Sequence, residues 1–195
     1  TMKKLILSVF ILFSLIFHAT AQTSGVKVKV NVNFNSFQSI EIGSGANPQG
    51  GYDDVVNLTY ATAEDYRNGV SQYVANQLKV SSVGTGYKVK AKLSNANLTR
   101  VGSNGIATIP ASDILQVKVG KAIGAATSGN TLSTGGHEFL LSSTSDGGSS
   151  VLAEELDVKY FGLAIPEAKV KEYFNNVGKQ NIAYTVDVTY EVVPN

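Results

Sequence analysis

The chain has 195 residues, contains no cysteine and carries a formal net charge of +1 at pH 7. Lys3 and Lys4 lie in a segment that we expect to be cleaved; without them, 16 basic residues become 14 against 15 acidic ones, a net charge of about −1. Such a balance gives no long-range field for nucleic acid or anionic membranes. The missing cysteines exclude disulfides, cysteine nucleophiles and thiolate metal sites.

The chain begins like an exported protein. Met2-Lys3-Lys4 is followed by an apolar run over residues 5–17 and by the small residues Ala19-Thr20-Ala21. This order predicts a secretory signal peptide over residues 1–21, cleaved after Ala21. An uncleaved anchor is the alternative, but a spanning helix needs about 20 apolar residues. We therefore expect a protein that is secreted, periplasmic or on the cell surface, with no membrane insertion after cleavage.

The first part of the mature chain alternates strictly. Apolar residues occupy every second position between residues 26 and 34: Val26, Val28, Val30, Val32 and Phe34. Lys27, Lys29, Asn31 and Asn33 lie between them. A period of two with β-branched side chains predicts a long strand with one buried face. The strand could pair within its own chain, which we favour here, or be donated to a neighbouring molecule.

Two further strands and one helix are expected before residue 70. Phe37, Ile40 and Ile42 indicate a strand, and the Gly- and Asn-rich stretch over residues 43–54 indicates a loop. Val56, Leu58 and Tyr60 alternate and predict another strand. The sequence Thr62-Ala-Glu-Asp65 resembles a helix capping box, and Gly69 should end the helix after one or two turns.

The clearest hairpin signal lies in the middle of the chain. Leu78 and Val80 are followed by Gly84-Thr-Gly86 and by an alternating run that starts at Tyr87 and ends at Leu93. Strand, glycine turn and strand together predict a β-hairpin. Lys88, Lys90 and Lys92 alternate with the apolar residues of the second strand, so we expect them on its solvated outer face.

The rest of the chain continues this pattern. Apolar clusters predict short strands over residues 106–109, 114–119, 139–141 and 156–160. Residues 120–136 read as a long loop or irregular hairpin, and residues 165–174, with a proline early, as a short helix. The last strand, residues 182–193, places Ile182, Tyr184, Val186, Val188, Tyr190 and Val192 on one face.

Many short strands separated by turns favour a single all-β domain over residues 22–195. We expect an antiparallel β-sandwich, immunoglobulin-like or jelly-roll-like, with at most two short helices. A closed barrel is the alternative. We predict no fixed repeat and no domain boundary within the mature chain.

The sequence indicates no catalytic, metal or cofactor site. His137 lies at the edge of a Gly-rich stretch without a nucleophile motif, so we interpret it as a loop residue. Glu154, Glu155 and Asp157 could pair as in a glycosidase, but the chain has no tryptophan to line such a cleft. Calcium at Asp53-Asp54 is a further alternative, although no Asp-x-Asp-x-Asp-Gly run is present.

A ligand-binding loop remains possible on sequence grounds. Aromatic and acidic side chains that could bind glycans occur in three nearby stretches: Tyr52, Asp53, Asp54, Tyr66 and Tyr73. Tyrosines on alternating strands, such as Tyr184 and Tyr190, are instead expected to belong to the core.

Two stretches resemble a known group of proteins. They are the ending Tyr184-Thr-Val-Asp-Val-Thr-Tyr190-Glu-Val-Val-Pro194, and the segment from Leu78-Lys-Val80 to Tyr87-Lys-Val89. Together they resemble the spore-coat-U-like, archaic chaperone–usher pilins and related secreted β-proteins of Bacteroidota. The usual disulfide of such subunits is absent, and the final strand looks complete, whereas these pilins borrow one.

The resemblance implies a non-enzymatic structural or adhesive surface protein, such as a pilus or fibre subunit. Its partners would be copies of itself, in a homopolymer, or other surface proteins, and Val26–Phe34 would be the donated strand. A secreted carbohydrate- or ligand-binding module is the alternative function.

Overall fold

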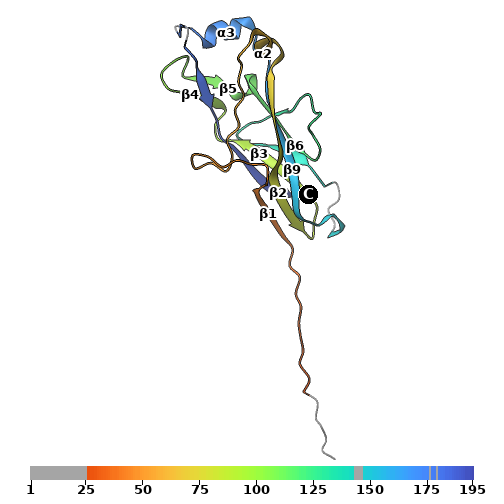
Figure 1. Ribbon diagram of the computed structural model, residues 1–195. Helices are drawn as coiled ribbons and strands as arrows, with labels where there is room; N and C mark the ends of the chain where they lie inside the picture. The colour runs from red at the N-terminus through yellow and green to blue at the C-terminus, as the bar shows by residue number, and fades with distance from the viewer. Residues whose placement is uncertain (1–25, 143–146, 176, 179) are drawn as a thin grey trace, which may run out of the picture. The chain divides into compact units, whose positions relative to one another are not determined.

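The computed structural model describes residues 26–142, 147–175, 177–178 and 180–195 (Figure 1). The chain divides into two compact units, one up to Phe34 and one from Asn35 to Asn195. We call the second unit the body and describe each unit by itself. The predicted signal peptide, residues 1–21, lies outside the described residues.

The body consists of two layers of antiparallel strands. The first layer is a five-stranded sheet, in the order β1 (Phe37–Ile42), β2 (Val70–Val83), β9 (Val151–Gly162), β6 (Leu115–Gly120) and β7 (Asn130–Thr131). The second layer contains two three-stranded sheets. One has the order β11 (Val188–Pro194), β3 (Tyr87–Leu93) and β8 (His137–Leu140), and the other β10 (Ala183–Thr185), β4 (Asn97–Val101) and β5 (Thr108–Pro110).

The two small sheets continue one another. β4 follows β3 closely along the chain and β10 immediately precedes β11, and β10 pairs with β4 as β11 pairs with β3. Two short helices, α2 (Ala63–Asn68) and α3 (Glu167–Tyr173), lie together at the upper end in Figure 1. Two 3-10 turns complete the described elements, η1 (Ala111–Asp113) and η2 (Gly147–Ser149).

The core lies between the two layers. Its fully buried side chains come from alternate positions of the inner strands: Leu78, Val80, Val117, Val119, Leu156 and Val158 from the first layer, and Tyr87, Val89, Ala91, Leu93 and Phe139 from the second. This alternation is what one buried face per strand requires. The prediction of an all-β antiparallel sandwich is confirmed.

The predicted hairpin is wrong, although its two strands exist. β2 and β3 belong to different layers, so the turn at Gly84–Gly86 carries the chain across the sandwich instead of folding it back onto the same sheet. The hydroxyl of Ser82 donates to the carbonyl of Thr85 at 2.9 Å and helps to fix this turn. Alternation and a glycine turn predict a reversal of direction, but they do not distinguish lateral pairing from face-to-face packing.

Two predicted strands differ from the structure. Residues 182–193 form two strands, β10 and β11, interrupted at Val186-Asp187, although the alternation of burial continues through the break. Residues 55–60 are assigned to no strand, yet Val56, Leu58 and Tyr60 are half-buried and the residues between them exposed. Here the hydrophobic pattern correctly gives the inward face, but no neighbouring backbone completes a ladder.

The segment Val26–Phe34 is the largest departure from expectation. No strand is assigned from residue 26 to residue 36, and residues 26–34 are exposed. The favoured expectation of a strand paired within its own chain is therefore wrong for the described chain. Alternation specifies which face a strand would bury but cannot by itself supply the partner strand.

The helix predictions agree with the structure. Thr62 caps α2, and the capping box is complete because Thr62 accepts from the N–H of Asp65 while the Asp65 carboxylate accepts from the N–H of Thr62. Gly69 ends the helix with φ of 82°. Pro166 precedes α3 as its N-cap. Residues 70–75, for which no element was predicted, form the first half of β2, and β4 was not predicted either.

Candidate functional site

The exposed apolar row of Val26–Phe34 is unusual for a soluble chain. The side chains are exposed by 90% at Val26, 77% at Val28 and Val30, 70% at Val32 and 91% at Phe34. Contiguous exposed apolar surface generally marks an interaction site, and single scattered apolar residues do not. The row has the period of a strand and no ladder, so it has the pattern of a strand that lacks a partner.

In the body, the core is only partly covered at the edge of the second layer that β11 forms. The inward side chains of β3 are buried almost completely, with Val89 at 0% and Leu93 at 4% exposure. The inward residues of β11, Val188, Tyr190 and Val192, are only half-buried. The reason is topological: β3 has β11 on one side and β8 on the other, whereas β11 pairs with β3 alone among the described strands.

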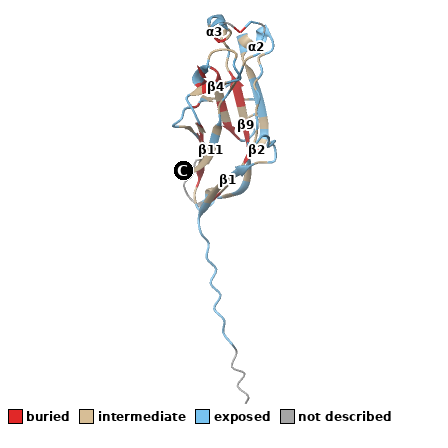
Figure 2. Cartoon of the chain, turned by 90° about the vertical axis from the view of Figure 1, so that its left-hand side faces the viewer, coloured by how far each residue is buried: buried red, intermediate tan, exposed pale blue. Residues whose placement is uncertain are grey.

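Other half-buried apolar side chains occur next to this edge. Ile40 on β1 and Val56 and Leu58 in the unpaired stretch pack against the core without being covered. β1 is the edge strand of the first layer and approaches β11 across the sandwich. We call the region formed by β1, residues 55–60 and β10–β11 the open side (Figure 2).

The opposite side of the sandwich is better covered. There the stretch after β6 supplies the short strand β7 and Leu132, which is buried to 4% exposure. Phe139 on β8 is likewise buried, at 6%. The contrast shows that the half-burial on the open side is not a general property of the sandwich edges.

The outer edge of β11 has no backbone partner among the described residues. β11 forms its ladder with β3 from Val188↔Leu93 to Pro194↔Tyr87. The flanking hydrogen bonds, from Ser94 to Asp187 and from Asn195 to Gly86, connect to the same neighbour. An antiparallel edge strand presents alternate N–H and C=O groups outward, so β11 offers about seven residues of free edge.

A chain of buried polar groups crosses the core beside the open side. Gln77 donates to the Asp54 carboxylate at 2.6 Å, and its amide oxygen accepts from the Tyr160 hydroxyl at 2.9 Å. The Tyr160 and Tyr190 hydroxyls lie 2.8 Å apart. These hydrogen bonds therefore join the loop before residue 55, two strands of the first layer, β2 and β9, and β11 of the second layer.

A bulge in β2 makes this chain possible. Its register against β9 shifts between Val74 and Leu78, and Asn76 has φ of 53°. The irregularity allows Gln77 and Leu78 to be buried in succession, at 2% and 4% exposure. Sequence reasoning missed Gln77, and the only local signal was an asparagine, a residue that tolerates positive φ.

Burial keeps the hydroxyl groups of Tyr160 and Tyr190 in their neutral, protonated form. Burial raises the pKa of Tyr160 to about 12, although its hydrogen bonds to Tyr190 and Gln77 act in the opposite direction. Burial also raises the pKa of Tyr190 well above its ordinary value, and the nearby Tyr160 and Asp54 add to the effect. Both hydroxyls thus remain available as donors throughout the physiological range.

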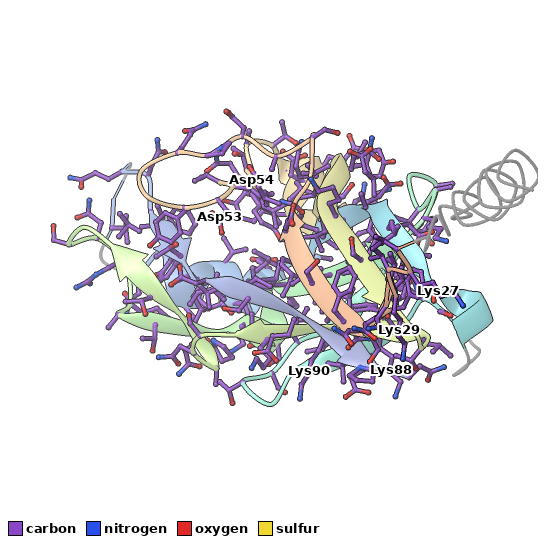
Figure 3. The ribbon with its side chains drawn as sticks, turned by 90° about the horizontal axis from the view of Figure 1, so that it is seen from below. Lys27, Lys29, Asp53, Asp54, Lys88 and Lys90 are labelled. Atoms are coloured by element: carbon purple, nitrogen blue, oxygen red, sulfur yellow. The ribbon has the colours of Figure 1, made fainter. Side chains whose placement is uncertain are left out.

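The predicted ligand-binding residues do not form one cluster. Tyr52 is 56% exposed and closes a small bridge with Gln49, and Asp53 is exposed beside it (Figure 3). Tyr66 lies on α2, where the centre of its ring is 5.3 Å from that of Tyr60 and the two rings are tilted by 41°. Only Asp54 and Tyr73 come together, because both line a hollow beside β2.

Asp54 already has three partners. One carboxylate oxygen accepts from the N–H of Asn47 at 3.1 Å and of Val55 at 2.8 Å, and the other accepts from Gln77. Tyr73 is also fixed, because its hydroxyl donates to Asp157 at 2.7 Å. These contacts give Asp54 a structural role in holding the loop against β2.

The acidic residues of β9 are each engaged separately. Glu154 accepts from Tyr87 and pairs with Lys121 at 2.5 Å, and Glu155 accepts from Ser44 at 2.7 Å. Asp157 accepts from Tyr73 and from the N–H of Asn76 at 3.0 Å. His137, expected in a loop, begins β8, where its ring contacts that of Phe139 edge-on.

The lysines of β3 are partly solvated. Lys88, labelled in Figure 3, pairs with Glu138 at 3.2 Å, and Lys92 pairs with Glu191; both lysine side chains are partly exposed. Exposed pairs of this kind contribute little to stability, typically below about 1 kcal/mol. Their arrangement agrees with the expected outer face.

Within the described part of the chain, no group of three histidine or acidic side chains gathers in a way that could hold a metal ion. No helix there has the length and apolar character needed to cross a bilayer.

Comparison with known proteins identifies no family. The sequence matches no protein-family model, and no curated protein matches it.

Proposed function

We propose that the protein is an exported, non-enzymatic structural or adhesive surface component whose copies assemble by strand donation. In this proposal the segment Val26–Phe34 of one molecule pairs with the body of the next. The observation that carries the proposal is the exposed row of five apolar side chains, which has the period of a strand and no ladder.

The open side of the body is the proposed acceptor. β11 offers a free backbone edge, and its inward side chains Val188, Tyr190 and Val192 are half-buried for lack of a neighbour. A strand added there would gain backbone hydrogen bonds with β11 and would place alternate side chains between the two layers. Valine and phenylalanine are suited to that interior, and Lys27 and Lys29 would point to solvent.

The energy terms are large enough for stable association. Full burial contributes about 1.5–3 kcal/mol for each such apolar side chain, so five contribute roughly 7–15 kcal/mol. Association costs on the order of 4–15 kcal/mol in lost freedom. Each backbone hydrogen bond adds about 0.5–1.5 kcal/mol. The gain from side-chain burial is therefore of the same order as the cost of association, and the hydrogen bonds of the backbone ladder would add to the gain.

The proposed contact is heterologous, since the donating and accepting surfaces are different. A heterologous contact produces a ring if the rotation closes and a filament if it does not. A fibre or homopolymer is therefore the expected product, in agreement with the resemblance to pilin-like proteins. The amino-terminal sequence supports export, because residues 1–21 have the pattern of a signal peptide.

A matched pair of substitutions tests the proposal. In the exported form, Gln22–Asn195, Val30→Asp places a charge in the apolar row, whereas Asn31→Asp places the same charge on the opposite face. We expect Val30→Asp to abolish assemblies seen by gel filtration and negative-stain microscopy, because a buried unpaired carboxylate is strongly disfavoured. Asn31→Asp should assemble normally. Equal assembly of both variants, or a monomeric parent chain, would refute strand donation.

The alternative function is binding of carbohydrate. The observation that favours this alternative is a groove lined by amide and hydroxyl side chains beside β2. Carbohydrate binding is also compatible with an adhesive surface protein.

A further inference from the structure

Two adjacent shallow hollows lie along the first half of β2, and we call them together the groove. Two hollows, of about 450 and 560 Å³, are both lined by Asn57 and Gln72. One wall is the stretch over residues 54–59 and the other is β2 from Val70 to Ala75. This groove is distinct from the outer edge of β11, where we propose that the donated strand binds.

Apart from the carboxylates of Asp54 and Asp65, the lining is uncharged and rich in hydrogen-bonding groups. Amide and hydroxyl side chains predominate among its polar residues: Asn47, Asn57, Thr59, Ser71 and Gln72. No lysine or arginine is among the described residues that line the groove. The carboxylates of Asp54 and Asp65 already accept backbone hydrogen bonds. The groove thus has no net charge complementary to an anion, and its carboxylates are occupied structurally.

The backbone of β2 adds further donors and acceptors. β1 pairs with β2 only from Phe37↔Val83 to Ile42↔Leu78, and irregular bonds from Gly43 and Gly45 extend the contact to Gln77 and Asn76. Among the described residues, Val70–Ala75 has no backbone hydrogen bond outside its ladder with β9. Its outward N–H and C=O groups therefore face the groove or solvent.

One aromatic ring lies at the groove. Tyr73 lines the larger hollow and is 39% exposed, and its hydroxyl is held by Asp157 at 2.7 Å. A ring fixed at its polar end loses little freedom when a ligand stacks on its face. Neutral donors and acceptors next to a fixed aromatic ring suit a chain of sugar rings, which have apolar faces and hydroxyl edges.

We infer that this groove binds a neutral oligosaccharide. Gln72 and Asn57 would contact its hydroxyl groups in both hollows, and Tyr73 would stack against one ring. The inference does not depend on strand donation, because the groove lies within a single body.

Binding can be tested with the exported form, Gln22–Asn195, and a defined panel of neutral hexasaccharides: those of cellulose, laminarin, mannan, xylan and chitin. We expect at least one to bind in calorimetric titration and to shift the amide resonances of residues 57–59 and 71–73. Gln72→Ala, which removes an exposed side chain without a structural partner, should weaken binding roughly tenfold or more. Tyr73→Ala should do the same, and Tyr52→Ala, an exposed tyrosine that does not line the groove, should leave it unchanged.

Three results would overturn the inference: no binding by any member of the panel, shifts that map elsewhere, or equal weakening by Tyr52→Ala. A Ser/Thr-rich hexapeptide serves as a competing probe for the free edge of β2. If this peptide shifts residues 70–75 and no saccharide does, the groove takes an extended peptide instead and the saccharide inference fails.

Discussion

Two stretches of this chain have nearly the same pattern and very different environments. Val26–Phe34 reads V-K-V-K-V-N-V-N-F, and β3 reads Y-K-V-K-A-K-L. In β3 the apolar residues are buried to between 0% and 4% exposure, while in Val26–Phe34 they are exposed by 70% or more. β3 lies between β11 and β8, whereas no strand is assigned to the first stretch.

The comparison separates two properties of an alternating stretch: which of its faces is apolar, and whether that face is buried. Alternation determines which face of an extended chain is apolar, and in β3, over residues 55–60 and over residues 182–190 that face is the more buried one. Whether that face becomes buried depends on neighbouring strands, which come from distant parts of the sequence. A stretch with the pattern but no neighbour is therefore a reasonable place to expect a partner molecule.

The largest effect expected within the comparison is on folding stability. Leu93→Ala, in β3, should lower the free energy of unfolding by about 2–5 kcal/mol, since it leaves a cavity in a close-packed core. Val30→Ala, in the exposed row, should leave it within about 0.5 kcal/mol. Urea unfolding at concentrations where the chain is monomeric would measure both. A loss of more than about 1 kcal/mol for Val30→Ala would mean that the row is buried within its own molecule.

A smaller effect is expected from the polar chain beside the open side. Gln77→Ala leaves the Asp54 carboxylate and the Tyr160 hydroxyl without their shared partner. We expect a loss of about 1–3 kcal/mol in the free energy of unfolding, because buried polar groups are costly to leave unpaired. The control is Gln72→Ala, an exposed glutamine on the same strand. Similar losses in both variants would show that the buried hydrogen bonds of Gln77 make no particular contribution to the free energy of unfolding.

The smallest expected effect is a change in pH dependence. Burial by itself would raise the pKa of Asp157, but hydrogen bonds from the Asn76 N–H, the Tyr73 hydroxyl and the N–H groups of Ile123 and Ala122 outweigh it and hold the pKa below its ordinary value. As the pH falls, the unfolded chain is protonated first. The stabilisation is therefore complete above the ordinary pKa of about 3.9 and is lost as the pH falls through the lower folded value.

Asp157→Asn removes this titration. The variant should lose less stability than the parent chain when the pH is lowered from 5 to about 2, as measured by urea unfolding at each pH. Asp65, whose pKa is also lowered by its capping-box hydrogen bonds, is unchanged in both chains and serves as a common background. Parallel pH profiles would contradict the assigned role of Asp157.

The sequence supported the class of fold and most of its elements. Local signals sufficed for α2, where Thr62, Asp65 and Gly69 each have a defined capping role, and for the burial phase of residues 182–190. The sequence does not show to which sheet a strand belongs. We therefore expected β2 and β3 to pair side by side, although they lie in different layers of the sandwich. The break at Val186-Asp187 and the bulge at Asn76 depend on tertiary packing and have only weak local signals.

The candidate site was predictable in part. Val26–Phe34 was identified by its alternation, but its exposure follows from the absence of a neighbouring strand and could not be seen in the pattern. The grouping of Tyr52, Asp53, Asp54, Tyr66 and Tyr73 reflected nearness in sequence, and only Asp54 and Tyr73 meet at one hollow. Asn57 and Gln72 were missed because isolated amides carry no sequence signal for a groove.

The most direct test of strand donation uses the absence of cysteine in this chain. One preparation would carry Val30→Cys and a second would carry a cysteine on the inward face of β11, at Val188, Tyr190 or Val192. Side chains on the same face of paired strands come close enough for a disulfide. We predict that at least one mixture forms a disulfide-linked dimer on non-reducing gels, whereas Val30→Cys with Leu140→Cys, an exposed position on β8, does not. Absence of a link at all three β11 positions, or equal linking at Leu140, would contradict donation of Val26–Phe34 to the open side.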